Sequence, residues 1–367
     1  MILNLVVTSL VLGLMLIFGH KWSKRGTVDL TAVQSSHRQV TVRFGGVAVI
    51  FGLSSIIFTD FLSSVVISLL ISGLPIFTAG LLEDISGKIR PRNRLLAAFL
   101  SAGLAVFLTG MYLNYGDFWF LDKLFVIPIV AIPITILISS GIANSFNIID
   151  GVNGFSASVA LVIACVLGSI CHSYNEPQLS YFCYMIAIAC IPFLLVNFPF
   201  GLIFLGDAGA YTLGHLLSWV AIILIYRHPE ISAWAMLLIF FWPATETLLS
   251  IYRRFMSKMP SAAPDSFHFH QIIMQLLQLK FSTDSKFNVW ANPFSTLILL
   301  PLAVIPILVS LIVIKHNIFA VLIYLTLVAG YFLLYLVLLK KLKSVALASG
   351  RHDLANRLKY VFKPSKK

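Results

Sequence analysis

Carboxylates occur at three points where a long apolar run of this sequence meets a polar stretch. Glu83 and Asp84 are adjacent in "GLLEDISGKIRPR", Asp150 follows asparagines in "NSFNIIDGVNG", and Asp207 lies between glycines in "FLGDAG". Proteins commonly hold Mg²⁺ with one or two carboxylates and let substrate phosphates complete its shell. These residues therefore predict phosphate chemistry with Mg²⁺, or with Mn²⁺ in its place, and Glu83, Asp84, Asp150 and Asp207 could supply the metal ligands.

The adjacent acids can serve different purposes, because neighbouring side chains on a helix point about 100° apart. One of the two, Glu83 or Asp84, can face a metal ion while the other faces a reacting oxygen. Two acids at the C-terminal end of a helix oppose its dipole, and that cost suggests a use. A solvated helix end beside basic partners is the structural alternative.

Basic, amide and histidine side chains beside the carboxylates could hold phosphate oxygens. His268 and His270 follow the Pro-containing stretch "SKMPSAAPD", and neither a Cys nor a third His lies near them. A loop histidine is more often a surface residue, but we favour a contact with a diphosphate over a zinc site. The candidate catalytic residues are Glu83, Asp84, Asp207, His268 and His270. The candidate binding residues are Arg43, Lys88, Asn144, Asn147, Asp150, Asn153, Arg253 and Arg254.

Other features have structural alternatives too. The stretch around Asn153 could be a polar turn with Asn and Gly at left-handed positions, but that leaves its carboxylate unexplained. Asp207 could cap a helix, which stabilises it by about 1 kcal/mol, although the flanking glycines favour close approach of a diphosphate. Glu246 and Arg253 are seven residues apart and share a helix face, so a structural ion pair is as plausible as a substrate contact.

The elements that carry these residues are membrane spans. The 367 residues are 59% hydrophobic and 11% charged, whereas soluble domains are about one quarter charged. A span needs about 20 mostly apolar residues, which predicts an all-α polytopic membrane protein with about eleven spans. These lie near residues 2–19, 44–60, 63–82, 95–113, 124–142, 155–172, 180–197, 208–226, 232–251, 294–314 and 318–339. Residues 1–339 would form one membrane-embedded catalytic domain, and residues 340–367 a basic cytoplasmic tail.

Lys and Arg predict the orientation, because cytoplasmic loops are enriched in them. With the N-terminus outside and the C-terminus in the cytoplasm, 23 of the 26 basic residues lie inside, and Lys123, Arg227 and Lys315 lie outside. Every carboxylate cluster near the membrane then falls on the cytoplasmic face. The net charge of +12 belongs to the same face, where anionic lipids lie, and it is no sign of nucleic-acid binding.

Five motifs in this order resemble the polyprenyl-phosphate N-acetylhexosamine-1-phosphate transferases (MraY/WecA-like, glycosyltransferase family 4). They span residues 35–271, and each lies in a predicted inside loop. The motifs are "SSHRQVTVRFGG", "GLLEDISGKIRPR", "NSFNIIDGVNG", "FLGDAG" and "RRFMSKMPSAAPDSFHFHQ".

The resemblance implies transfer of a HexNAc-1-phosphate from a UDP-sugar to undecaprenyl phosphate at the cytoplasmic face of a bacterial inner membrane, with Mg²⁺ bound and UMP released. Asp207 and Glu83 would hold the ion. Asp84 would act as a base or as a covalent nucleophile, and both remain open. By the same resemblance, Arg43, His268, His270 and Arg253 would steady the diphosphate, and Asn147 and Asp150 would face uridine or the sugar.

Departures from the family pattern favour a branch that starts O-antigen or related polysaccharides. Glu83 stands where the family has its first Asp, Gln271 stands where a further His is common, and the first loop lacks the usual Pro before Arg43. The basic residue after the acid pair corresponds to Lys88. None of these names the sugar.

The main alternative is an ion-coupled secondary transporter, which would place acids near the bilayer midplane and show internal pseudo-symmetry. A non-catalytic scaffold would not need convergent carboxylates. The sequence leaves the oligomeric state open, a homodimer included. It also leaves open whether the basic tail does more than lie on anionic lipid.

Overall fold

The fold of this chain is known from a computed structural model that describes residues 1–22, 41–257, 267–280, 289–358 and 361–362, with the backbone alone for residues 19–22. Within these residues the regular secondary structure is helical apart from one isolated parallel bridge between Val42 and Ile203, and turns and loops join the helices. The helices, in order, are α1 (Ile2–Trp22), α2 (Gly45–Ser54) with its continuation η1 (Ser55–Phe58), α3 (Ser64–Ser86), α4 (Pro91–Thr109), α5 (Trp119–Phe125), α6 (Pro128–Ile149), α7 (Phe155–Ser173), α8 (Pro177–Asn197), α9 (Gly206–Arg227), α10 (Ala233–Ile239), α11 (Phe241–Met256), α12 (Phe269–Lys280), α13 (Ala291–Ile312), α14 (Asn317–Ala348) and α15 (His352–Leu358).

The predicted class, an all-α polytopic membrane protein, is confirmed. Among the described residues, eight helices are long and apolar enough to cross a membrane, and the bent pair α10–α11 can form a ninth span. The helices α1 and α2–η1 are apolar but shorter. Each of the eleven predicted spans overlaps one of these helices or pairs, although the number eleven itself stays a prediction.

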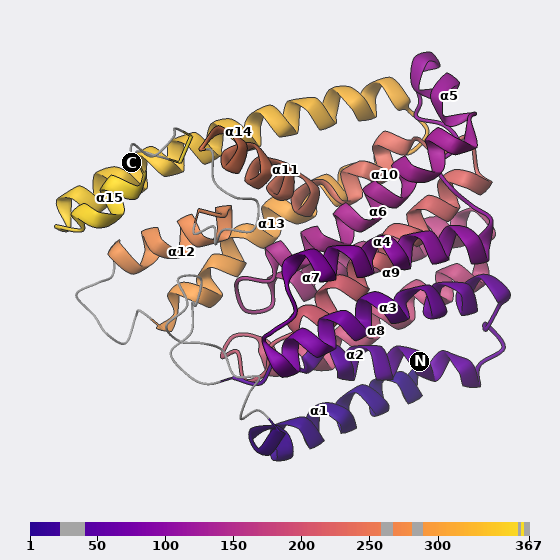
Figure 1. Cartoon of the computed structure of the whole chain (residues 1–367), viewed down its shortest axis with the longest axis horizontal. Helices are drawn as coiled ribbons and strands as arrows, with labels where there is room; N and C mark the ends of the chain where they lie inside the picture. Colours follow the sequence, from indigo (N-terminus) through magenta and orange to yellow (C-terminus); the bar gives the residue numbers. More distant parts are fainter. Residues whose placement is uncertain (23–40, 258–266, 281–288, 359–360, 363–367) are drawn as a thin grey trace.

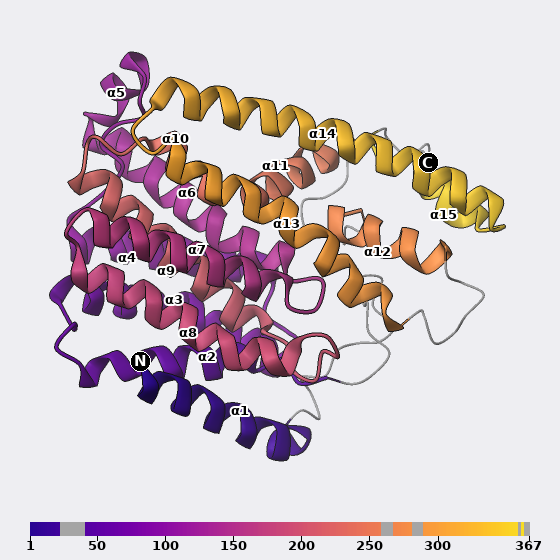
Figure 2. The same cartoon turned by 180° about the vertical axis from the view of Figure 1, so that it is seen from behind.

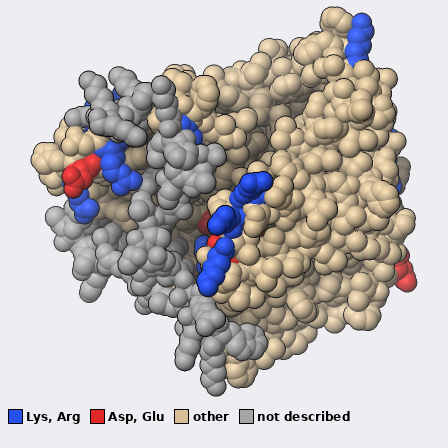
Figure 3. Space-filling model, in the orientation of Figure 1, with Lys and Arg blue, Asp and Glu red and all other residues tan. Residues whose placement is uncertain are grey.

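The long helices lie roughly side by side, and the two ends of the bundle differ (Figures 1 and 2). The helices α12 and α15 project at one end, together with the C-terminus, whereas α5 lies at the other. In the space-filling view, the broad surface of the bundle carries few charged atoms (Figure 3). Lys and Arg atoms instead line a hollow near the end that carries α12, and Asp or Glu atoms are visible inside it.

Helix α9 is the centre of the bundle, since its apolar span is completely buried among the neighbouring helices. It packs against α2, α3, α6 and α7. Glycines allow this close approach: a Cβ on Gly46 would come within 2.2 Å of the Gly209 Cα, and a Cβ on Gly80 within 2.6 Å of the Ala208 N. The first turn of α9 is therefore fixed tightly between α2 and α3.

The predicted span 232–251 is not straight, because α10 and α11 meet at an angle of 84°. Pro243, near the start of α11, has no N–H to donate to the Ile239 carbonyl, so one continuous α-helix cannot form there. The bend turns α11 toward α14 and brings Glu246 next to the start of α12. Between η1 and α3 the chain turns at Thr59–Asp60, where Thr59 is extended.

Candidate active site

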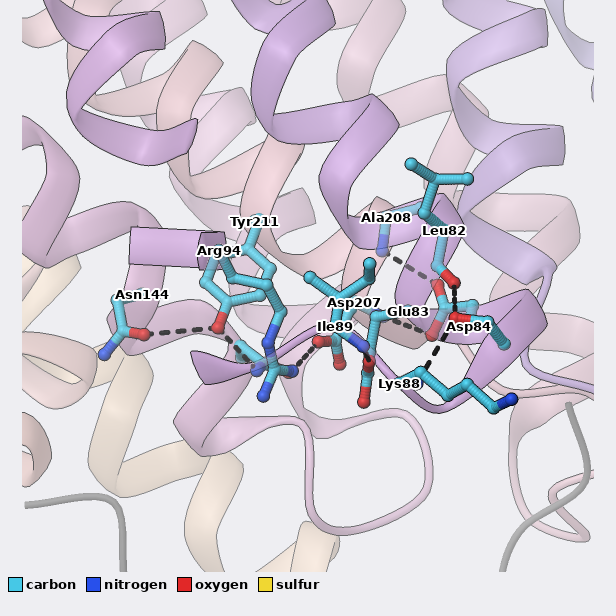
Figure 4. A network of polar contacts seen from close by, with 12 residues as sticks. Leu82, Glu83, Asp84, Lys88, Ile89, Arg94, Asn144, Asp207, Ala208 and Tyr211 are labelled. Atoms are coloured by element: carbon cyan, nitrogen blue, oxygen red, sulfur yellow. Dashed lines mark hydrogen bonds and ion pairs between the residues drawn. The ribbon is translucent and has the colours of Figure 1, made fainter. Parts of the chain in front are cut away.

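The first turn of α9 is the centre of the candidate site, and Asp84 binds it directly (Figure 4). The Asp84 carboxylate accepts the backbone N–H groups of Asp207 and Ala208, each at 2.9 Å. The side chain is almost completely buried. Unpaired N–H groups at a helix N-terminus attract anions, and Asp84 satisfies two of them. Its position fixes α3 to the start of α9.

Asp207, in that first turn, forms an ion pair with Arg94 from α4. The side chains are only 6% and 16% exposed, so water screens this pair less than an ion pair on the surface. The Nε of Arg94 is buried and has no hydrogen-bond partner among the described residues. A buried donor without a partner is rare, and a ligand oxygen at this point would satisfy it. Arg94 was not among the predicted site residues.

Tyr211 joins the Asn-rich stretch to α9. Its hydroxyl accepts a hydrogen bond from Asn147 Nδ2 at 3.0 Å and donates to Asn144 Oδ1 at 3.2 Å. Tyr211 lies one turn after Asp207 on the same helix, and Figure 4 shows it beside Arg94. The predicted binding residues Asn144 and Asn147 are thus brought to the same place as Asp207.

Glu83 points differently from Asp84, as expected for neighbours on a helix. One of its carboxylate oxygens accepts the Ile89 N–H at 2.7 Å, which closes the turn after α3. Gly87 adopts a left-handed conformation in this turn, with φ +62°. Glu83 is partly buried and Lys88 is exposed.

Arg43 and Asp150 approach the site from two loops. The backbone around Arg43 is held by hydrogen bonds of 2.8 Å, from Phe204 N to Val42 O and from Gly45 N to Phe204 O. Burial raises the pKa of Asp150 well above its ordinary range, Arg43 lowers it, and the carboxylates of Asp207 and Asp84 raise it.

The histidines meet the Asn-rich stretch at Gly151. A Cβ on Gly151 would lie 2.0 Å from the His270 Nε2, so only glycine fits beside this ring. The rings of His268 and His270 are parallel, with centroids 5.6 Å apart. Both side chains are buried. The start of α12 and the Asn-rich stretch therefore meet at Gly151, while residues 35–40 and Asp265 lie outside the described residues.

Other predicted residues have structural contacts. Asn153 fixes its loop, because its N–H donates to Asn292 Oδ1 at 2.8 Å and its side-chain amide donates to the Pro199 carbonyl at 2.8 Å. Arg253 is buried, donates to the Tyr335 hydroxyl at 3.1 Å and lies 4.0 Å from Glu246. Arg254, the next residue, is partly buried.

The oxygen donors here fit Mg²⁺ or Mn²⁺, since both prefer carboxylates and phosphates. Within the described part of the chain, no three His, Cys, Asp or Glu side chains form a ready metal cage. A metal ion held by one or two of these carboxylates and by the oxygens of a diphosphate is compatible with this arrangement. Asp207 and Glu83 each have carboxylate lone pairs beyond the contacts described above.

Comparison with known proteins finds similarity over the part of the chain that carries this site. Residues 66–225 match the model of "Glycosyl transferase family 4", a region that includes Asp84, Asp150 and Asp207. The chain is 26% identical to a "Probable undecaprenyl-phosphate N-acetylglucosaminyl 1-phosphate transferase" of Bacillus subtilis (strain 168), over 68% of this chain and 70% of that protein.

Two further relatives extend the comparison. An "Undecaprenyl-phosphate alpha-N-acetylglucosaminyl 1-phosphate transferase" of Yersinia pestis is 26% identical over 69% of this chain and 70% of its own. A "Decaprenyl-phosphate N-acetylglucosaminephosphotransferase" of Mycolicibacterium smegmatis is 23% identical over 68% and 69%. The region that matches glycosyl transferase family 4 contains the turn of α9 that Asp84 and Arg94 bind, so the similarity covers the candidate site.

Proposed function

We propose that this protein transfers an N-acetylhexosamine-1-phosphate from a UDP-sugar to undecaprenyl phosphate at the cytoplasmic face of the bacterial inner membrane. The products are UMP and a lipid-diphosphate-linked sugar that starts a cell-envelope polysaccharide of the O-antigen type. The observation that carries the proposal is the meeting of Asp84, Asp207, Arg94 and the Asn-rich stretch at one helix terminus. Because the three relatives are named for N-acetylglucosamine transfer, UDP-N-acetylglucosamine is the first donor to test.

Phosphoryl transfer depends mainly on positioning and on neutralising charge. Arg94 and Arg43 would bind oxygens of the UDP-sugar diphosphate, and the unpartnered Arg94 Nε is a ready donor for one of them. Asp207 and Glu83 would hold Mg²⁺, which, when bound, supplies further neutralisation of the diphosphate. Asn147 and Asp150 would face uridine or the sugar.

Asp84 could take part in the transfer by two routes, which differ in the bond that its carboxylate forms. As a base it takes a proton from the lipid phosphate, whose oxygen then attacks the β-phosphorus while UMP departs. As a nucleophile it attacks the β-phosphorus itself, releases UMP, and passes the sugar phosphate to the lipid. The two backbone N–H groups that Asp84 accepts weaken it as a base and as a nucleophile alike, so the choice between the routes falls to the labelling experiment below.

The test uses purified full-length protein in detergent with undecaprenyl phosphate, Mg²⁺ and a panel of UDP-N-acetylhexosamines, and measures UMP release. We expect release that requires lipid and Mg²⁺ and that Asp207→Asn and Asp84→Asn abolish. Exchange of labelled UMP into the UDP-sugar without lipid would support the nucleophile route instead. If folded protein releases no UMP from any donor, the proposal fails and the ion-coupled transporter becomes the better explanation.

A further inference from the structure

The hydroxyl group of Tyr211 bonds two asparagine side chains at once, and the proposed mechanism gives it no role. It accepts a hydrogen bond from Asn147 Nδ2 at 3.0 Å and donates one to Asn144 Oδ1 at 3.2 Å. The two asparagines lie three residues apart on α6, so they share one face of that helix. Tyr211 contacts both of them from α9, the helix whose first turn carries Asp207.

These hydrogen bonds determine which end of each amide faces the tyrosine. A tyrosine hydroxyl has a single hydrogen, so it can donate to only one acceptor. The two amides accordingly turn opposite ends toward it. Asn144 presents its oxygen to Tyr211, and Figure 4 shows its nitrogen turned away from the tyrosine. Asn147 presents its nitrogen, which makes its oxygen the outward end.

The outward ends of the two amides can reach a ligand. Asn144 Nδ2 and Asn147 Oδ1 have no hydrogen-bond partner among the described residues. Both asparagines are partly exposed, whereas Tyr211 is only 4% exposed. A substrate would therefore meet the asparagines, and the tyrosine would act from behind them.

The ring of Tyr211 is held by packing that does not involve its hydroxyl. It lies in a small buried cluster with Ile76, Ala98 and Ala143, which come from α3, α4 and α6. A phenylalanine ring has the same shape and can fill the same space. The substitution Tyr211→Phe therefore removes the two hydrogen bonds and keeps the apolar contacts.

The asparagine pair lies beside the groups that would bind the diphosphate. Figure 4 shows Tyr211 beside Arg94, with Asn144 on one side and Asp207 on the other. Asn144 Nδ2 is a donor, like the unpartnered Arg94 Nε, and suits a phosphate oxygen. Asn147 Oδ1 only accepts, so it suits a hydroxyl or N–H group.

We propose that Tyr211 is a positioning residue for the UDP-sugar, acting through Asn144 and Asn147: its hydroxyl fixes which end of each amide faces the substrate. Asn144 then donates to a diphosphate oxygen, and Asn147 accepts a hydrogen from a hydroxyl or N–H group of the nucleotide sugar. Without the tyrosine hydroxyl, either amide can exchange its oxygen and nitrogen ends. This role rests on the proposed function, because it takes the UDP-sugar as the ligand.

The experiment measures the Kd of UDP-N-acetylglucosamine for the purified full-length protein in detergent with Mg²⁺, by isothermal titration calorimetry. We expect Tyr211→Phe to raise this Kd by about 3- to 10-fold, the effect of about one hydrogen bond. In a background with Asn144→Ala and Asn147→Ala, the same change should cost less than about twofold, because side chains in one network are not additive. Equal costs in both backgrounds would overturn the proposal.

Titration with UMP shows which part of the donor meets Asn147. If Tyr211→Phe weakens UMP as much as the UDP-sugar, the contact is with the nucleotide. If it weakens the UDP-sugar alone, the contact is with the sugar. Both results support the inference, and an unchanged Kd for both ligands would overturn it. Should Tyr211→Phe not fold, Asn144→Ala and Asn147→Ala serve singly, and an unchanged Kd in either would overturn the inference.

Tyr115→Phe is the matched control. It also removes a tyrosine hydroxyl with two hydrogen bonds, to the carbonyls of His228 at 3.0 Å and Ile231 at 2.8 Å, but beyond the other end of α9. We expect its Kd to stay within about twofold of the wild type. An equal rise with both variants would contradict the inference. If the wild type neither binds a UDP-sugar nor releases UMP, the proposed function fails and this inference with it, whereas a wild type that binds and a Tyr211→Phe variant that binds equally well would overturn the inference alone.

Discussion

Arg94 is the cation that lies against the predicted metal ligand Asp207, and its Nε has no partner in the described part of the chain. The two facts suggest two tasks for one guanidinium. One of its edges compensates a buried carboxylate, and the other is available to a phosphate oxygen. At the scale of single residues, Arg94 is therefore the side chain whose removal should disturb the site most selectively.

We predict that Arg94→Gln lowers kcat/KM by about 10- to 100-fold, because a hydrogen bond to a charged group contributes about 1.5–3 kcal/mol. Arg92→Gln is the matched control, since Arg92 lies on the same helix but is exposed. We expect it to leave kcat/KM within about twofold of the wild type. Steady-state UMP release with both variants checks this, and equal losses would show that only the positive charge of this segment matters.

Single residues also show what the sequence could reveal. Glu83, Asp84, Asp150 and Asp207 were predictable, because charged groups beside apolar runs are costly and conspicuous. Tyr211 was not, since a tyrosine inside an apolar span looks like any packing aromatic until the fold brings Asn144 and Asn147 to its hydroxyl. No local signal separated it from the other tyrosines.

At the scale of elements, one contact joins the Asn-rich loop to α12. Gly151 leaves just enough room for the His270 ring. We predict that Gly151→Ala pushes His270 from its place, lowers activity by at least about 10-fold, and destabilises the fold by about 1–3 kcal/mol through overpacking. Activity and thermal unfolding of the purified variant are the measurements.

Gly141→Ala is the control for that substitution. Gly141 lies on α6, the helix that precedes the same loop, and a Cβ there would meet nothing within 4 Å. Replacing a helical glycine with alanine should stabilise the helix by up to about 1 kcal/mol and leave activity unchanged. If both variants lose activity alike, the contact with His270 is not the cause.

The C-terminal segment packs against the same region. The Ser257 hydroxyl donates to the Val361 carbonyl at 2.9 Å, and the Arg357 guanidinium lies 5.5 Å from the Phe267 ring centroid. Helix α14 itself runs without a break to Ala348, past the end of the apolar run at residue 339. The C-terminal segment therefore contacts Ser257 at the end of α11 and Phe267 just before His268. The composition of the segment did not reveal these contacts.

We predict that ending the chain at Gly350 lowers kcat by about 10-fold or more, because a small misplacement of a site residue is expensive even from a distance. The control, Lys340→Gln with Lys341→Gln, removes two exposed charges and keeps the packing. It should behave as the wild type in the same UMP assay. A loss with the control and none with the truncation would assign the tail to lipid attraction instead.

The helices were predictable where the length of an apolar run determines their position, and less predictable where tertiary contacts determine their shape. The apolar runs located the helices within a few residues. The bend at Phe240 has a signal, Pro243, but a proline in an apolar run can also be a mild kink. Gln271, which departs from the family pattern, has a clear place in the fold because it caps α12 through the His268 N–H.

At the scale of the whole molecule, charge differs between the two ends of the bundle. Of the three basic residues predicted outside, Arg227 donates to Glu176 at 2.5 Å and Lys123 lies 4.5 Å from the Trp119 ring centroid. Such pairing reduces the net charge of that end, whereas the opposite end carries the site and is predicted to hold 23 of the 26 Lys and Arg residues. Lys and Arg excess marks the cytoplasmic side, so the site should open to the compartment that supplies nucleotide sugars.

This orientation is testable with single cysteines in a variant whose four natural cysteines are replaced. We predict that Gln178→Cys, an exposed position near Glu176, reacts with a membrane-impermeant maleimide on intact spheroplasts. Ser349→Cys and Asn93→Cys, exposed at the other end, should react only after the membrane is permeabilised. The opposite pattern would put the carboxylates outside, away from UDP-sugars, and would remove the physical basis for the transferase. The predicted spans place Gln178 on one side of the membrane and Asn93 and Ser349 on the other. Labelling of all three positions from one side would therefore contradict the predicted arrangement of spans.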